Sequence, residues 1–261
     1  MTKRFLFSVI VLLGFVAGQL DAQEAFEIEV YPYATAVRGE WELETHLNYA
    51  RLGTTMFDGT VAPTQRQVRM AAELTRGITD HWEVSGYLLA AHRSDAGLEY
   101  AGWRLRSRMR APERWRLPLR VGFGVELVGS RAAYSESPRT LEVIAIFEKR
   151  LGPLRLTVDP TFERDLASSA QEDGWEFEPK ARAAVDVSRV VTLGLEYYGA
   201  LGEVGQFLPA GRQVHQFYPS VDLRLGDDFA VNLGVGVGAT NAGDRLVFKS
   251  RFEIPLGGEK H

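Results

Sequence analysis

Hydrophobic and polar residues alternate one by one along most of this chain. In residues 40–49 every second position is Trp, Leu, Thr or Tyr, and the positions between them are Glu, His or Asn. Successive side chains of a β-strand point to opposite faces, so this pattern predicts a strand with one apolar and one polar face. A helix would need apolar residues three and four positions apart, and that spacing is not sustained here.

The same alternation recurs in segments of about ten residues, the length that a tilted strand needs to cross a bilayer. Short turns and longer polar loops connect them in turn, as in bacterial outer-membrane barrels. We therefore predict an all-β fold, a transmembrane antiparallel up-and-down β-barrel of about 12 strands. The predicted strands are 40–49, 67–75, 82–92, 103–110, 119–129, 141–150, 154–163, 176–187, 191–198, 214–225, 229–238 and 245–254.

The start of the chain reads as an export signal. Lys3 and Arg4 precede an apolar run of about thirteen residues, which suits a signal peptide and is too short to span a bilayer. We expect cleavage after Ala22 and location in the outer membrane of a Gram-negative cell; an N-terminal membrane anchor is the alternative. The predicted parts are a signal peptide (1–22), a periplasmic N-terminal segment (23–39), the barrel (40–256) and a C-terminal tail (257–261).

Aromatic residues mark both ends of the predicted strands, with Trp41 and Trp82 at one end and Tyr49 and Phe217 at the other. Such rings prefer bilayer interfaces, which favours a membrane barrel over a soluble β-sandwich. The expected partners are therefore outer-membrane lipid and lipopolysaccharide. The last predicted strand, 245–254, is similar to the C-terminal signal that the barrel-assembly machinery reads, so this machinery is a further expected partner during biogenesis.

Three stretches of sequence carry a family resemblance. They are the opening YPYATA at residues 31–36, the first strand GEWELETHLNY at residues 39–49, and the glycine-rich closing pair of strands. In these features the chain resembles the outer-membrane proteins grouped with the phenol meta-cleavage-pathway family. The resemblance implies an outer-membrane barrel and, loosely, a transporter. It defines no functional residues.

The polar face of the predicted strands is dense in charge, and acidic and basic residues nearly balance there. A twelve-strand barrel has a backbone radius of roughly 12 Å, so long side chains fill most of its width and exclude a wide pore. A narrow passage bordered by glycines and an arginine wall is one interpretation; arginines paired with carboxylates of adjacent strands are the other. The predicted solute path comprises Arg69, Glu73, Arg104, Arg106, Arg108, Arg110, Gly122, Gly124, Gly234, Gly236, Gly238, Lys249 and Arg251.

These features favour a narrow passive channel or transporter for small solutes, with anionic or aromatic acids as candidates. A sealed structural or assembly barrel that presents loops to a partner is the alternative, and residues 23–38 could then act as a plug or a docking arm. An outer-membrane enzyme is disfavoured. His92 and His215 point outward without a recognisable serine partner, and His46 points inward, where we expect it to form hydrogen bonds.

Charge and composition argue against several classes of partner and cofactor. The formal net charge of −4 at pH 7 argues against nucleic acid as a partner. The chain has no cysteine, which removes thiolate metal sites and covalently attached haem. The histidines lack metal-site spacing, so we expect no metal and no cofactor.

Overall fold

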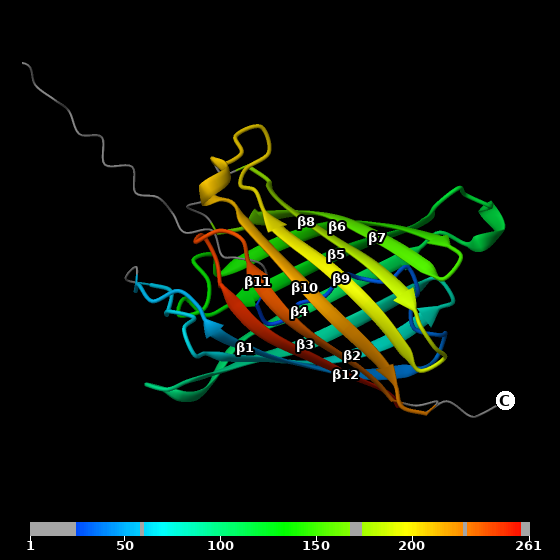
Figure 1. The fold of residues 1–261 in the computed structure, drawn as a ribbon, viewed down its shortest axis with the longest axis horizontal. Helices are drawn as coiled ribbons and strands as arrows, with labels where there is room; N and C mark the ends of the chain where they lie inside the picture. Colours follow the sequence, from blue (N-terminus) through cyan, green and yellow to red (C-terminus); the bar gives the residue numbers. More distant parts are fainter. Residues whose placement is uncertain (1–24, 58–59, 168–173, 227–228, 257–261) are drawn as a thin grey trace, which may run out of the picture.

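Twelve antiparallel strands form a closed barrel in the computed structural model, in which each strand pairs with its neighbours in sequence and β1 pairs with β12 (Figure 1). The predicted fold class and strand number are confirmed. The structure describes residues 25–57, 60–167, 174–226 and 229–256. The predicted signal peptide and C-terminal tail lie outside these residues.

The observed strands lie within a few residues of the predicted ones, except at the start of β4. They are β1 (Trp41–Leu52), β2 (Val68–Thr79), β3 (Trp82–Arg93), β4 (Gly97–Arg110), β5 (Arg120–Ser130), β6 (Arg139–Leu151), β7 (Leu154–Asp165), β8 (Glu176–Asp186), β9 (Val191–Ala200), β10 (Val214–Arg224), β11 (Ala230–Gly238) and β12 (Leu246–Leu256).

The start of β4 was predicted at Trp103, but the strand begins at Gly97. The register between β3 and β4 shifts at one point, where Leu89 pairs with Gly102 and Ala90 pairs with Tyr100. Ala101 is therefore an extra residue, and both it and Gly102 are buried. Such a β-bulge interrupts the alternation of the strand, which is why the sequence pattern missed its first part.

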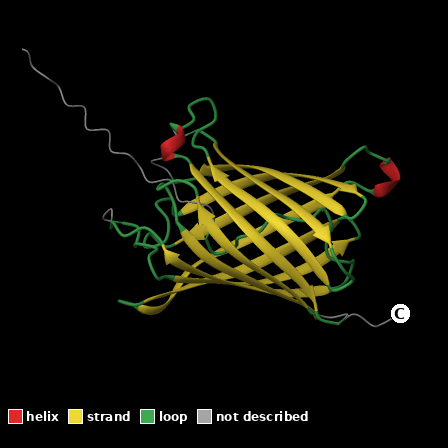
Figure 2. Cartoon of the chain, in the orientation of Figure 1, coloured by secondary structure: helices red, strands yellow, loops and turns green. Residues whose placement is uncertain are grey.

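The connections differ in length at the two ends of the barrel (Figure 2). We call the end that holds the β2–β3 and β6–β7 turns the short-turn end, and the end that holds the β1–β2 and β9–β10 loops the long-loop end. Two 3-10 turns, η1 (Glu113–Trp115) and η2 (Ala210–Arg212), lie at opposite ends. None of the helices in the described part of the chain is long and apolar enough to cross a membrane.

The apolar face of the strands points outward and the charged face points inward. On β4, Leu105 is 55% exposed and Met109 is 49% exposed, whereas Arg104 is 1% exposed and Arg106 is 6% exposed. This is the reverse of a soluble domain, in which the apolar side chains fill the core. The interior of the barrel is therefore a polar lumen.

Residues 25–40, the luminal segment, run through this lumen before β1 begins (Figure 1). The segment starts near Asn48, at the long-loop end of β1, and ends where Gly39 donates a backbone hydrogen bond to Gly77. A Cβ on Gly77 would overlap the carbonyl of Val37, so glycine permits this close approach. We expected a periplasmic segment that acts either as a plug in the lumen or as a docking arm; the described residues lie inside the barrel, where wall side chains bind their polar groups.

Candidate functional site

The lumen is the candidate functional site, and its most charged element is the arginine row of β4. Arg104, Arg106, Arg108 and Arg110 point inward because they occupy every second position of the strand. The first three are less than a tenth exposed. Buried guanidinium groups require carboxylate or carbonyl partners, and these partners show which parts of the protein the arginines bind.

Carboxylates of the barrel wall and of the luminal segment bind the first two arginines of the row. Arg104 donates to Glu126 of β5 at 2.8 Å and also to Glu27 of the luminal segment. Arg106 donates to Glu27 at 3.1 Å and also to Glu73 of β2. The row therefore pairs with wall carboxylates, as one of our two interpretations expected, and additionally with a carboxylate of the luminal segment.

Arg108 binds the backbone of the luminal segment. Its Nη1 and Nη2 atoms donate to the carbonyl oxygens of Pro32 and Ala34, each at 2.9 Å. Its Nε atom donates to Glu83 at 2.7 Å, and Glu83 also accepts a hydrogen bond from the backbone N–H of Ala36. One arginine–glutamate pair thus satisfies three backbone groups of a segment that has no strand partner.

Side chains of other strands also form hydrogen bonds with the backbone of the luminal segment. Asn48 donates to the carbonyl of Phe26 at 3.1 Å, and Lys249 donates to that of Ile28 at 3.0 Å. The backbone N–H of Tyr31 donates to Asp159 at 2.7 Å. These contacts come from β1, β12 and β7, so the segment is fixed from several sides.

Aromatic rings of the segment pack against the basic residues of the wall. Arg106 lies 4.6 Å from the ring centroid of Tyr31, and Arg110 lies 5.2 Å from that of Tyr33. Arg69, a predicted site residue, lies 5.0 Å from that of Phe26. Cation–π contacts gain strength when both groups are removed from water, as they largely are here.

The long-loop end of the lumen is nearly filled. The ring of Phe26 makes an edge contact with Tyr134 of the β5–β6 loop at 6.0 Å. Burial and a hydrogen bond to Glu99 raise the pKa of Tyr134 to about 12, so its hydroxyl stays a donor at neutral pH. The gap beside Asn48 and Gln67 has a volume of about 10 Å³, too small for more than about one water molecule.

The predicted luminal glycines face inward, but large side chains cover them. A Cβ on Gly122 would lie 3.2 Å from Ile146, and one on Gly234 would lie 2.8 Å from Lys249. A Cβ on Gly236 would overlap the ring of Tyr218. A Cβ on Gly124 would make an ordinary contact with Ile144 at 3.6 Å, and one on Gly238 would overlap the backbone of Asp244. Gly122, Gly234 and Gly236 therefore make room for neighbouring side chains.

A cavity of about 430 Å³ remains at the short-turn end, between the luminal segment and the wall formed by β7, β8 and β10–β12. Arg182 there binds Asp222, and Arg251 binds Glu29 and lies 3.9 Å from Glu253. Arg155, an inward-facing arginine outside the predicted solute path, also lines the cavity. Its side chain makes no hydrogen bond or ion pair with another described residue, so it is available to a solute.

The outward-facing histidines show no catalytic arrangement in the described part of the chain. His215 lies on the outer face of β10, where its Nδ1 atom is 2.8 Å from the hydroxyl of Tyr197 and its Nε2 atom is 3.1 Å from Gln213. These contacts anchor an aromatic group at the long-loop rim. The site is therefore a lumen that charged side chains line and the luminal segment occupies.

No family model and no curated protein matches the chain. Among solved structures, it is similar to the COG4313 outer membrane channel from Pseudomonas putida F1, with a TM-score of 0.57 at 13% identity over 88% of this chain and 100% of that one. It is also similar to the KdgM porin in complex with disordered oligogalacturonate, with a TM-score of 0.53 at 8% identity over 84% of this chain and 99% of that one. The chain has the fold of outer-membrane channels. At these identities the likeness shows the fold alone, and the resemblance to the phenol meta-cleavage family stays a prediction.

Proposed function

We propose that this protein is an outer-membrane channel for small solutes and that the luminal segment closes it. Strands of 9 to 14 residues with an apolar outward face suit a bilayer, and a charged lumen suits a water-filled path. Insertion in the outer membrane and export through a cleaved signal peptide belong to the same proposal.

One observation carries the gating part of the proposal. The hydrogen-bonded ring of strands is complete without the luminal segment, because β1 pairs directly with β12 from Trp41 to Leu52. Apart from the backbone hydrogen bonds that Gly39 and Glu40 form with Gly77, the hydrogen bonds between the segment and the wall involve side chains, and the segment crosses the lumen between the two mouths. Its displacement would therefore open the lumen without breaking the barrel.

The cavity at the short-turn end favours anionic solutes. The side chain of Arg155 has no hydrogen bond or ion pair with another described residue there. Arg224 donates to the carbonyl of Arg189 at 3.3 Å and lies 3.9 Å from Asp186. Guanidinium groups bind carboxylates and phosphates through two parallel hydrogen bonds. We therefore propose small carboxylates, aromatic acids included, as solutes, with the cavity as the site that they meet at this mouth.

Conductance in planar bilayers tests the proposal. The mature chain should show small and infrequent openings, whereas a chain that lacks residues 25–37 should conduct severalfold more and prefer anions in a salt gradient. In the truncated chain, Arg155→Gln should reduce that preference, and Arg114→Gln, at an exposed turn, should leave it unchanged.

A sealed barrel that presents its loops to a partner is the second candidate, favoured by the 10 Å³ gap at the long-loop end. The two functions differ in one result. If the truncated chain folds, shown by heat-modifiable mobility on gels, and still does not conduct, the channel proposal fails and the sealed barrel is supported.

A further inference from the structure

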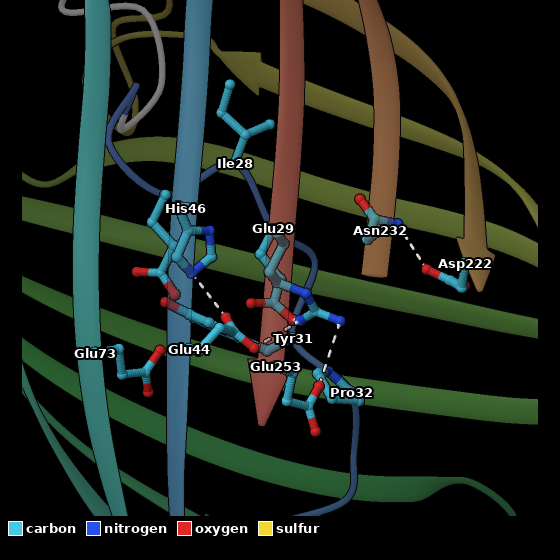
Figure 3. A network of polar contacts seen from close by, with 12 residues as sticks. Ile28, Glu29, Tyr31, Pro32, Glu44, His46, Glu73, Asp222, Asn232 and Glu253 are labelled. Carbon is cyan, nitrogen blue, oxygen red and sulfur yellow. Dashed lines mark hydrogen bonds and ion pairs between the residues drawn. The ribbon is translucent and has the colours of Figure 1, made fainter. Parts of the chain in front are cut away.

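One histidine and three glutamates meet in the middle of the lumen, where the luminal segment passes β1 and β2. Glu44 and His46 belong to β1, Glu73 belongs to β2, and Glu27 belongs to the segment. One side-chain nitrogen or oxygen atom from each of the four lies within 4.8 Å of the others. Figure 3 shows the three wall residues on adjacent strands, with Glu44 and His46 directed toward each other.

The imidazole of His46 is buried without a hydrogen bond at Nε2. The residue is 3% exposed, and Nε2 lies 2.7 Å from a carboxylate oxygen of Glu44 but makes no hydrogen bond with it or with another described residue. A contact at this distance is favourable when a positive centre, either a proton on the imidazole or a metal ion, lies near both atoms. Buried polar atoms normally have a hydrogen-bond partner, and Nε2 has none among the described residues.

Carboxylates outnumber cations around this point. Three arginines contact the cluster, and each of them pairs with at least two carboxylates. Uncompensated negative charge in a buried site is costly, so the arrangement favours a further cation. The arginines are Arg104, Arg106 and Arg251, and the carboxylates are Glu27, Glu29, Glu44, Glu73, Glu126 and Glu253.

We propose that Glu27, Glu44, His46 and Glu73 bind one divalent transition-metal ion, for which zinc is the reference. Imidazole nitrogen and carboxylate oxygen are zinc ligands, and four of them suit its tetrahedral preference. Carboxylates have several acceptor positions, so Glu27 and Glu73 can accept from Arg106 and still bind a metal. Arg106 then orients both ligands from the second coordination sphere, as hydrogen-bonding groups commonly do around metals.

The site would connect the luminal segment to the barrel wall, because Glu27 is the only one of the four ligands outside the strands. This consequence rests on the proposed function. A metal that binds only when Glu27 lies against β1 and β2 favours the closed state by its differential affinity for it. Zinc would therefore act as a latch on the segment.

Metal content tests the site without any transport measurement. The full mature chain, purified in detergent and stripped with a chelator, is equilibrated with zinc chloride and then assayed for bound zinc. We expect one zinc per chain in the wild type and in the matched control His215→Ala, whose histidine lies on the outer face. His46→Ala and Glu44→Gln should lower the zinc affinity by at least about tenfold.

Cobalt(II) adds a spectroscopic readout that separates this site from surface histidines. A tetrahedral site gives intense visible absorption bands, which we expect in the wild type and not in His46→Ala. If His46→Ala fails to fold, His46→Gln takes its place, because it keeps a polar side chain of similar size. Equal zinc content and equal cobalt spectra in the wild type and the His46 variant would overturn the proposal.

Conductance then tests the latch. Zinc should lower the open probability of the wild type severalfold and leave that of His46→Ala unchanged. A wild type that binds zinc at His46 but opens equally with and without it would overturn the latch and leave the metal site. A truncated barrel that never conducts would instead overturn the channel, and the metal content would still decide the site.

Discussion

At the scale of single residues, the lumen works through arginines that have two kinds of partner. Arg108 is the clearest case, since it binds Glu83 on the neighbouring strand and two carbonyl oxygens of the luminal segment. A side chain that only filled the barrel would need no backbone partner on a separate segment. The contacts of Arg108 therefore link the structure of the wall to the position of the segment.

Replacement of Arg108 by methionine should loosen the luminal segment and raise the open probability of the channel. The change removes two hydrogen bonds to the segment and leaves Glu83 with a buried charge, a type of loss that costs about 3 kcal/mol or more. Combination with Glu83→Gln removes that charge and isolates the effect on the segment. Single-channel recording of the double variant is the measurement.

The matched control is Arg114→Met, because Arg114 is exposed in the η1 turn. It should behave like the wild type. An open probability that stays unchanged in the Arg108→Met/Glu83→Gln chain would show that these contacts do not hold the segment.

The identity of the arginine partners was beyond sequence reasoning. The alternation correctly placed the four arginines of β4 on the inward face, because this requires only that every second side chain of a strand points to the same side. Glu27, however, lies 77 residues before Arg104 and 79 before Arg106. The four residues of the proposed metal site come from three separate segments, so no spacing of histidines could reveal them.

At the scale of strands, the alternation predicts where the strands lie, because each strand has one face toward a polar lumen and the other toward apolar surroundings. The pattern failed where this rule is locally broken, at the bulge of β4 around Ala101. Residues 26–33 also alternate, as FEIEVYPY, yet they form no strand. All of them except Pro32 are buried in the lumen, so the same pattern fits an enclosed segment.

The glycines of β11 make a prediction about strand packing. A Cβ on Gly236 would overlap the ring of Tyr218, which is fully buried and packs edge-on against Tyr198 at 5.3 Å. Gly236→Ala should therefore destabilise the barrel by about 1–3 kcal/mol, the usual cost of overpacking. The thermal midpoint of unfolding, followed by the change in gel mobility, should fall.

Gly211→Ala serves as the comparison, since a Cβ at Gly211 in η2 would meet no atom within 4 Å. Its midpoint should match that of the wild type. Equal midpoints for the two alanine variants would mean that the ring of Tyr218 moves aside freely, and that the glycine row has another role.

At the scale of the whole molecule, the lumen is asymmetric. The segment and the rings of Phe26 and Tyr134 fill the long-loop end, whereas a cavity of about 430 Å³ faces the short-turn end. A closed channel with one open vestibule admits solute from a single side until its gate moves. In the proposed channel, the position of the segment would therefore decide which mouth a solute can enter.

Cysteine labelling tests this asymmetry, because the native chain has no cysteine and each introduced thiol is unique. Arg155→Cys lies in the cavity, and Asn48→Cys lies at the filled end, where the native side chain is 3% exposed. A charged maleimide should modify the first thiol at a rate near that of Thr55→Cys in an exposed loop. It should modify the second at least about tenfold more slowly, since reaction there requires a local opening. Removal of residues 25–37 should abolish the difference, because the luminal segment is its physical cause. Equal rates at the two positions in the intact chain would mean that both ends are open, and the segment could then not be the gate.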